Sequence, residues 1–272
     1  MTPPRVLIIA GSDSGGGAGI QADIKAVTMF GGHAMTAITA ITAQNTVGVD
    51  EVMLVPADMV LKQIDAVVDD IGVDAVKIGM IGAADTAAAL ADRLATIGVP
   101  IVFDPVMIAT SGSRLADAPT IAAFERLMVI ATLVTPNLPE LEVLAGRRMR
   151  GEDDIVEAAL ALHRRHGCAV LAKGGHGTGP VVTDLLARAG TVVRRDSQRL
   201  DTADTHGTGC TLASAAATGL GAGRPLDRSV QDALLYVQAA LRAAPGFGEG
   251  HGPIGHALGL SPWDSIHKKS RG

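Results

Sequence analysis

Short runs of aliphatic, often β-branched residues alternate along the chain with longer alanine-rich segments. The short runs are apolar at successive positions, which is typical of strands that are buried on both faces of a parallel sheet. The predicted strands cover residues 5–10, 73–81, 100–107, 132–137 and 168–175, and the predicted helices cover residues 19–31, 86–98, 138–146, 153–167, 208–222 and 227–243. The pattern therefore predicts an α/β fold with a mostly parallel central sheet flanked by helices on both faces.

Two regions follow this pattern less clearly. Residues 35–45, MTAITAITAQN, repeat every three positions and fit neither helix nor strand, although their Thr and Ile content favours a strand. Residues 181–186 and 191–195 predict a hairpin that forms either a lid or an edge of the sheet. The chain shows no linker, low-complexity region or solenoid-length repeat, and 272 residues suit one large domain, so we expect a single domain over residues 1–272.

Charge and hydropathy exclude several classes of protein. The formal charge is −5 and the one basic run lies at residues 267–271, which argues against nucleic acid as a partner. No apolar stretch approaches the ~20 residues of a membrane span. The apolar run at residues 5–10 is too short for a signal-peptide core, so we expect a cytoplasmic protein. Cys168 and Cys210 form no disulfide framework or metal-binding spacing, and Cys168, in an apolar run, is expected to be buried.

Glycine-rich and polar loops follow the predicted strands, where parallel sheets bind their ligands. The first loop, GSDSGGGAGIQAD at residues 11–23, lets the backbone approach a ligand and brings Asp13 and Asp23 to the same mouth. It lacks the Gly-Lys-Ser/Thr ending of a P-loop and the spacing of the dinucleotide fingerprint. The alternative is a glycine turn with a solvated aspartate.

Two further loops carry oxygen ligands of the kind that Mg²⁺ prefers. Asp104 ends an apolar strand in VFDPVM, where burial of a carboxylate is costly unless a cation or hydrogen-bond donors meet it. In TPNLPE, Asn137 and Glu140 are three residues apart at a helix start, so both can point to one side. The alternatives are a structural role for Asp104, and an N-cap formed by Asn137 with Glu140 at the third helical position.

The last loop, THGTGC at residues 205–210, runs directly into an alanine-rich helix. The backbone N–H groups of Gly207, Thr208 and Gly209 at that helix N-terminus would form an anion site. The helix dipole favours thiolate over thiol, so we expect a lowered pKa for Cys210, which could then take a proton or attack an electrophile. The alternative is that Cys210 is a small packing residue.

Together these motifs resemble the ribokinase-like small-molecule kinases, and more narrowly the hydroxymethylpyrimidine/phosphomethylpyrimidine kinases of thiamine biosynthesis. The motifs that carry the resemblance are, in order, GSDSGGGAGIQAD, ITAQNTVG, KIGMIG, DPVM, TPNLPE, KGGH and THGTGC. The resemblance implies a three-layer α/β/α fold. It also implies phosphorylation of 4-amino-5-hydroxymethyl-2-methylpyrimidine and then of its monophosphate, with ATP and Mg²⁺ as cofactors. Relatives in this family often form homodimers, so we expect one here.

The resemblance also implies roles for single residues. Cys210 would be the catalytic base, beside an anion hole formed by Gly207, Thr208 and Gly209. Residues assigned to the pyrimidine are Gly11, Asp23, Gln44, Met80 and Met107. Residues assigned to Mg²⁺ and phosphate are Asp104, Asn137 and Glu140, and those assigned to the nucleotide phosphates are Lys173, Thr205 and Thr208. Asp204 stands where the family pattern has Asn and adds negative charge near the nucleotide.

Three other functions compete with this interpretation. A pyridoxal or pyridoxine kinase would share the fold and metal site, but Gln44 and Asp23 favour an aminopyrimidine ring. A cysteine hydrolase or acyltransferase would use Cys210 as nucleophile and His206 as base, but no Asp or Asn that orients His206 is evident in the sequence. A protein that senses a thiamine precursor without turnover would not need the cysteine and the metal-binding pair.

Overall fold

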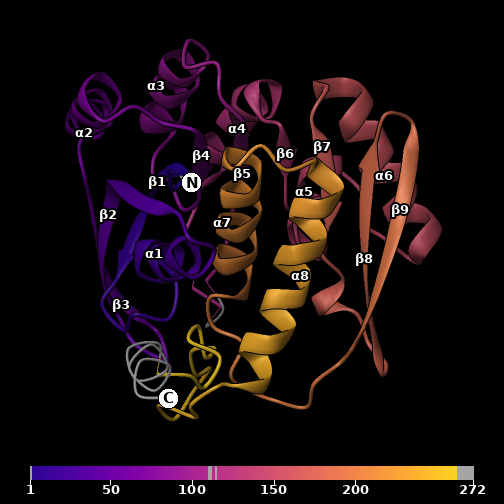
Figure 1. Cartoon of the computed structure of the whole chain (residues 1–272). Helices are drawn as coiled ribbons and strands as arrows, with labels where there is room; N and C mark the ends of the chain where they lie inside the picture. The colour runs from indigo at the N-terminus through magenta and orange to yellow at the C-terminus, as the bar shows by residue number, and fades with distance from the viewer. Residues whose placement is uncertain (1, 110–111, 114, 262–272) are drawn as a thin grey trace.

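The computed structural model describes residues 2–109, 112–113 and 115–261. Over these residues the chain forms one nine-stranded sheet in the order β3-β2-β1-β4-β5-β6-β7-β8-β9 (Figure 1). The strands are β1 (Arg5–Asp13), β2 (His33–Gln44), β3 (Val49–Leu54), β4 (Ala75–Ile78), β5 (Ile101–Phe103), β6 (Leu133–Val134), β7 (Ala169–Ala172), β8 (Val181–Arg188) and β9 (Thr191–Gln198).

The centre of the sheet is parallel and its two edges are antiparallel. Strand β1 pairs in parallel with β2 and β4, and the parallel pairing continues through β5, β6 and β7. Strand β3 pairs antiparallel with β2 at one edge, and β8 and β9 form an antiparallel hairpin at the other. The sequence left open whether this hairpin is a lid or an edge of the sheet, and in the structure it forms the edge.

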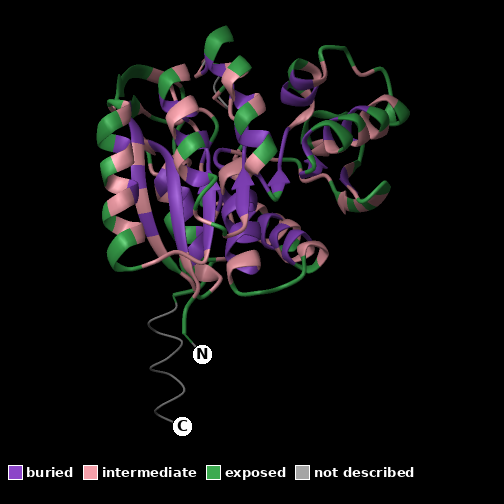
Figure 2. Ribbon diagram, turned by 90° about the horizontal axis from the view of Figure 1, so that it is seen from above, coloured by how far each residue is buried: buried purple, intermediate pink, exposed green. Residues whose placement is uncertain are grey.

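The helices divide between the two faces of the sheet because side chains alternate along each strand. They are α1 (Gly19–Met29), α2 (Ala57–Asp70), α3 (Ala84–Leu94), α4 (Ala118–Ile130), α5 (Leu138–Ala145), α6 (Glu152–His166), α7 (Thr208–Gly221) and α8 (Leu226–Arg242), with a 3₁₀ turn at Gly174–His176. Val6 and Ile8 of β1 pack with α1, α7 and α8, whereas Leu7 and Ile9 pack in the cluster that includes α2 to α6. The buried strands lie between these two helical layers, which confirms the predicted three-layer α/β/α architecture (Figure 2).

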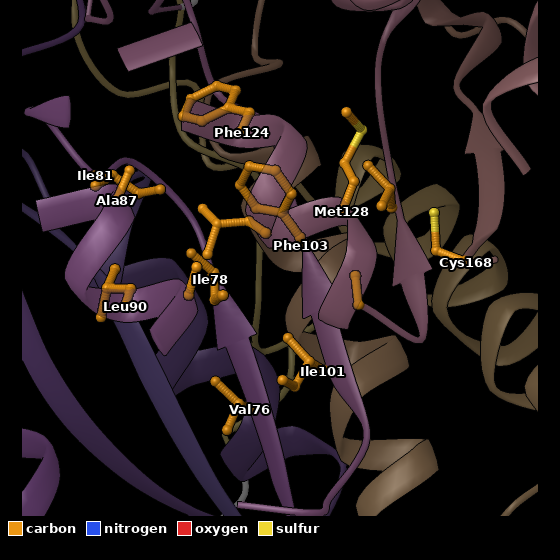
Figure 3. Close-up of a cluster of buried hydrophobic side chains, with 14 of the residues drawn as sticks. Val76, Ile78, Ile81, Ala87, Leu90, Ile101, Phe103, Phe124, Met128 and Cys168 are labelled. Atoms are coloured by element: carbon orange, nitrogen blue, oxygen red, sulfur yellow. The ribbon is translucent and has the colours of Figure 1, made fainter. Parts of the chain in front are cut away.

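The larger of the two cores is mainly aliphatic, as the scarcity of aromatic residues requires. Val76, Ile78 and Leu90 pack there with Phe103 and Phe124, whose rings meet edge to face at 5.1 Å (Figure 3). Cys168 belongs to the same cluster and is 2% exposed, as the sequence predicts. Burial raises the pKa of its thiol to about 11, so Cys168 is a packing residue.

The structure also contains elements that the sequence pattern does not predict. Residues 35–44 of the ambiguous segment fall in strand β2, as their composition favours. Strand β3 and helices α2 and α4 lie outside the predicted elements, and β3 escapes the pattern because five of its six residues are exposed. None of the described helices has the length and apolarity needed to cross a bilayer.

Candidate active site

A cavity of about 640 Å³ opens where the loops after the parallel strands meet. Its wall contains almost every residue that the sequence analysis assigns to a site. These are Gly11, Gln44, Met80, Asp104, Met107, Asn137, Glu140, Lys173, Thr205, Gly207, Thr208, Gly209 and Cys210. The rule that ligands bind beyond the carboxyl ends of parallel strands thus brings loops from distant parts of the sequence to one cavity.

Two glycines shape the start of helix α7 into a cradle that suits an anion. Gly207 has φ +85°, and a Cβ there would lie 1.8 Å from the carbonyl oxygen of Gly17. A Cβ on Gly209 would lie 3.1 Å from the Lys173 ammonium and 3.4 Å from Asp104. The first-turn N–H groups of a helix have no acceptor within the helix, so this end offers donors as well as a nearby cation. The donor set and the space that glycine leaves fit a phosphate group.

A lysine–aspartate pair stands beside the cradle. The Lys173 ammonium donates to Asp104 Oδ1 at 2.8 Å, and the Thr135 hydroxyl donates to the same oxygen at 3.0 Å. Burial opposes the charge on Lys173, but Asp104 and Glu140 outweigh it, so its pKa lies above the usual value. Lys173 is therefore a fixed positive charge at the cavity wall.

Asn137 and Glu140 form the capping box that was the structural alternative for this motif. The Asn137 side-chain oxygen accepts from the Glu140 N–H at 2.9 Å, and Glu140 Oε2 accepts from the Asn137 N–H at 2.8 Å. Each side chain uses a single oxygen in the box, and the Glu140 carboxylate also accepts from the Met107 N–H. The box fixes both side chains at the cavity wall, so capping and ligand binding are compatible here.

Glu140 is a buried carboxylate that lies among other charged groups. It is 5% exposed, and burial, together with the negative charge of Asp104, raises its pKa to about 7 despite the opposing effect of Lys173. Among the residues that the structure describes, no three His, Cys, Asp or Glu side chains gather into a metal cluster. Two carboxylates and an amide suit Mg²⁺, which keeps several of its waters.

The environment of Cys210 corrects the expectation of a lowered pKa. Burial disfavours the thiolate, and the carboxylates of Asp23 and Asp104 add repulsion. Lys77 and the Gly19 N–H act in the opposite direction but do not prevail, and the pKa is raised to about 11. Desolvation thus outweighs the expected helix-terminus effect, and Cys210 is a thiol at neutral pH.

Asp23 also departs from its expected role as a pyrimidine ligand. Its side chain is fully buried, accepts from the Lys77 ammonium at 2.7 Å and accepts from the Ser214 hydroxyl at 2.7 Å. It does not line the cavity. Both of its oxygens are already paired within the protein, so the structure does not support Asp23 as a substrate ligand. Lys77, a charge inside the apolar run VDAVKIGMI, was the sequence signal for this buried pair.

His206 has the acidic partner that the sequence did not reveal. Its Nε2 lies 2.9 Å from Asp13 Oδ2 and 3.2 Å from the side-chain nitrogen of Gln44. Within the described chain, His206 Nε2 is thus paired with Asp13 and Gln44 and not with Cys210. Asp204, the departure from the family pattern, lies against the glycine-rich C-terminal loop, where a Cβ on Gly252 would come within 1.9 Å of its carboxylate.

Comparison with known proteins identifies the family. The sequence pattern of the family described as phosphomethylpyrimidine kinase matches residues 13–255. The chain belongs to the phosphomethylpyrimidine kinase family. Its match extends from Asp13 through the anion cradle to Gly255, so it includes most of the residues that line the cavity.

Curated relatives agree with this assignment. The chain is 48% identical over 254 residues to the hydroxymethylpyrimidine/phosphomethylpyrimidine kinase of Rhizobium meliloti, covering 92% of this chain and 96% of the relative. It is 47% identical over 255 residues, 93% of this chain, to the thiamine biosynthesis bifunctional protein ThiED of Geobacter sulfurreducens. The chain spans about half of that bifunctional protein, 52% of its length. The family and these relatives confirm that the chain is a kinase.

Solved structures show the same ribokinase-like fold but come from kinases with two names. The phosphomethylpyrimidine kinase of Clostridium difficile is 35% identical, with a TM-score of 0.77, over 87% of this chain and 99% of that one. The pyridoxal kinase of Bacillus subtilis, solved with ADP, is 31% identical, with a TM-score of 0.88, over 96% of this chain and all of that one. Structural similarity alone therefore does not separate the pyrimidine from the pyridoxal activity.

Proposed function

We propose that the chain uses ATP to phosphorylate the hydroxymethyl group of 4-amino-5-hydroxymethyl-2-methylpyrimidine, and then the resulting monophosphate, giving the diphosphate used in thiamine biosynthesis. The observation that carries the proposal is the juxtaposition, in one cavity, of an anion cradle with a lysine and a small pocket with polar and thioether groups. The relatives that share the whole chain length carry this activity in their names.

The nucleotide would bind with its phosphates at the cradle. Backbone N–H groups of Gly207 and Gly209 would face the transferred phosphate, with Thr208, Thr205 and the ammonium of Lys173 beside it. The Thr208 N–H itself donates to the Thr205 carbonyl oxygen at 3.3 Å. Phosphoryl transfer requires in-line placement and neutralised charge more than covalent participation by the protein. Asp104, Asn137 and Glu140 would hold Mg²⁺, which when bound supplies positive charge to the phosphates.

The pyrimidine would bind at the opposite part of the cavity, beside Gly11, Gln44, Met80 and Met107. A Cβ on Gly11 would lie 3.1 Å from the Met80 sulfur, so a side chain there would narrow the pocket. Met107 is 4% exposed and supplies an apolar wall. Gln44 supplies a side-chain amide that can hydrogen-bond to a ring that carries a nitrogen and an amino group.

Cys210 would accept the proton of the attacking hydroxymethyl group as the oxygen–phosphorus bond forms. Because its pKa is raised to about 11, the thiolate is a minor form at neutral pH, and turnover should rise as pH increases toward that value. General-base assistance is worth about 10²–10⁴-fold, so Cys210→Ala should lower kcat by that order and remove the rise with pH. ADP affinity should survive, because the cradle donors are backbone groups.

One incubation tests both the reaction and its substrate. Protein with Mg-ATP is given equal concentrations of the pyrimidine alcohol and pyridoxal, and the mono- and diphosphate products are followed by mass spectrometry. We expect pyrimidine monophosphate first and diphosphate later. A larger kcat/KM for pyridoxal would favour the pyridoxal kinase alternative, which the similarity to the Bacillus subtilis enzyme keeps in view.

The proposal includes a homodimer, supported by an apolar sheet edge. Strand β3 is an outer strand of the sheet and exposes Val52, Met53 and Leu54, with Ile41 of β2 beside it. Exposed apolar edge strands favour association with another chain. Sedimentation should give a dimer for the wild type and a monomer for Met53→Asp, and a wild-type monomer would refute this part of the proposal.

A further inference from the structure

A buried polar network connects the first glycine loop, the end of β2 and the residue before the anion cradle. Asp13, Gln44 and His206 form its centre, with His206 Nε2 2.9 Å from Asp13 Oδ2 and 3.2 Å from the Gln44 side-chain nitrogen. Asp13 is 3% exposed and His206 is 6% exposed. All three residues line the cavity, so their hydrogen-bond directions determine what a ligand meets there.

The partners of Asp13 decide where the proton on His206 lies. The Asp13 carboxylate accepts from the backbone N–H groups of Gly15 at 2.8 Å, Gly17 at 3.0 Å and Ala18 at 2.8 Å. Burial raises the pKa of Asp13, but the hydrogen bonds from His206, Ala18 and Gly15 and the charge of His206 together lower it below its usual value. An ionised carboxylate only accepts hydrogen bonds, so the His206 Nε2 beside it must carry a proton.

That proton conflicts with an orientation of the Gln44 amide in which its nitrogen faces His206. The amide nitrogen, itself a donor, faces the His206 Nε2–H at 3.2 Å. On the other side, Gln44 Oε1 lies 3.3 Å from the Thr42 hydroxyl, whose single proton has a better acceptor in the Ser12 carbonyl oxygen at 2.9 Å. Donor therefore faces donor on one side, and acceptor faces acceptor on the other.

A half-turn of the Gln44 amide resolves both conflicts at once, and such amide orientations are assigned from the hydrogen-bond network. The single His206 Nε2–H, which donates to Asp13 Oδ2, is then shared with the amide oxygen, and the amide nitrogen donates to the Thr42 hydroxyl oxygen. One of the two amide N–H groups is engaged by Thr42, and the second is available to a ligand.

We propose that His206 is a positioning residue that, held by Asp13, fixes the Gln44 amide with its oxygen toward His206 and its nitrogen toward Thr42. Gln44 therefore offers the ligand an N–H donor, and the site selects a ring with an acceptor nitrogen at that point. This inference rests on the proposed function, because it assigns a specificity role within the pyrimidine end of the cavity.

The packing around His206 supports a fixed ring. A Cβ on Gly17 would lie 2.4 Å from the ring carbon Cδ2, so the ring lies against the bare backbone of the first glycine loop. The His206 backbone N–H donates to the Gly252 carbonyl oxygen at 3.1 Å, which ties the residue to the C-terminal glycine-rich loop. A ring that packs on this loop, on a backbone tied to the C-terminal loop, can transmit its orientation to Gln44.

The first test reads the proton directly and needs no substrate. The wild-type chain is labelled with ¹⁵N-histidine, and His206 is assigned by the signal that is absent from His206→Gln. We expect a protonated Nε2 at neutral pH. An unprotonated Nε2 with the proton on Nδ1 would overturn the proposal, whether or not the chain phosphorylates the pyrimidine.

The second test is a double-mutant cycle on substrate recognition. His206→Phe keeps an aromatic ring and removes the N–H, so KM for the pyrimidine alcohol should rise about tenfold, the effect of one lost hydrogen bond. His206→Gln, which retains a donor, should recover part of that loss, while KM for ATP changes less than KM for the alcohol in both variants. In a Gln44→Ala background His206→Phe should add little to the KM of the alcohol.

The outcomes separate a positioning role from a structural one. Additive effects of His206→Phe and Gln44→Ala on the KM of the alcohol would show that His206 does not act through Gln44. If the wild type turns over no pyrimidine at all, the proposed function fails, while the tautomer measurement still decides the orientation of the network.

Discussion

Two lysine–aspartate pairs of nearly identical geometry lie near the anion cradle, and they differ in whether they reach the cavity. Lys77 meets Asp23 at 2.7 Å, and Lys173 meets Asp104 at 2.8 Å. Both side chains of the first pair are 0% exposed, whereas Lys173 is 14% exposed and lines the cavity with Asp104. We call Lys77–Asp23, which is sealed from the cavity, the closed pair, and Lys173–Asp104, which lines the cavity, the open pair.

The difference lies in the unused bonding capacity of the aspartate. In Asp23 one oxygen accepts from Lys77 and the other from Ser214, so the pair is complete within the protein. In Asp104 both donors, Lys173 and Thr135, use Oδ1, and Oδ2 faces the bare backbone at Gly209. The closed pair should thus govern stability, and the open pair should govern turnover.

The largest expected effect comes from breaking the closed pair. Lys77→Met leaves the Asp23 carboxylate buried without a cation, which should lower the free energy of unfolding by about 3–5 kcal/mol in urea titrations. The double variant Lys77→Met/Asp23→Leu removes both charges and should recover most of that loss. A Lys77→Met protein as stable as the wild type would contradict a closed, charge-balanced pair.

Breaking the open pair should act mainly on the reaction. Lys173→Met removes a cation from the proposed phosphate site and should lower kcat about 10²–10³-fold, the effect of one lost electrostatic donor. Water from the cavity can solvate the remaining Asp104, so the unfolding free energy should fall less than in Lys77→Met.

Lys62→Met, on the exposed face of α2, is the matched control for Lys173→Met. It should change neither kcat nor stability appreciably, because exposed ion pairs contribute about 0–1 kcal/mol. If Lys173→Met behaved like this control in steady-state assays, the open pair would have no role in turnover.

The comparison extends to His256, a buried histidine that contacts helix α7 at Thr211. His256 is 6% exposed, its Nε2 lies 2.9 Å from the Thr211 hydroxyl, and burial lowers its pKa to about 4. The unfolded chain binds the proton near pH ~6.5, so the unfolded state gains protons first on acidification and stability falls between about pH 6.5 and 4. The contribution approaches ~3 kcal/mol at the acid end of this window.

Urea titrations at several pH values across that window measure the effect. His256→Gln cannot bind the proton, so its unfolding free energy should depend less steeply on pH than that of the wild type. Equal slopes for the two proteins would show that His256 is not held neutral in the folded state.

The smallest expected effect is at Asn137, which combines both kinds of role. Asn137→Ala removes the N-cap of α5 and should lower the unfolding free energy by about 1 kcal/mol. Asn137→Asp retains a capping oxygen and should keep wild-type stability, while the added charge shifts the Mg²⁺ concentration needed for half-maximal rate. If neither variant altered the Mg²⁺ requirement, Asn137 would be a cap alone.

The sequence predicts the central strands and the cavity loops well because both depend on local patterns. Apolar runs mark strands buried on two faces, and parallel pairing brings their carboxyl ends to the same edge. The exposed strand β3 lacks such a pattern. The pairing of Asp13 with His206 could not be predicted either, because it joins the first loop to residues near the far end of the chain.

The two corrections at the site have different physical causes. Asp23 is buried on α1 with Ile20 and Val27, which lie three residues before it and four after it. That spacing indicates the packed face of the helix, so its burial was present in the sequence. The pKa of Cys210 depends instead on desolvation and on the carboxylates around it, which only the assembled cavity defines.

Helix α7 packs against β1, β4 and β5, strands from the first half of the chain, although it begins only at Thr208. A ribosome therefore completes all nine of the described strands before it makes the helix that covers one face and that we propose supplies the phosphate donors. An incomplete chain that stops before this helix would expose a large apolar surface and hold no ATP. Premature termination should thus yield fragments that proteases remove rather than partly active enzyme.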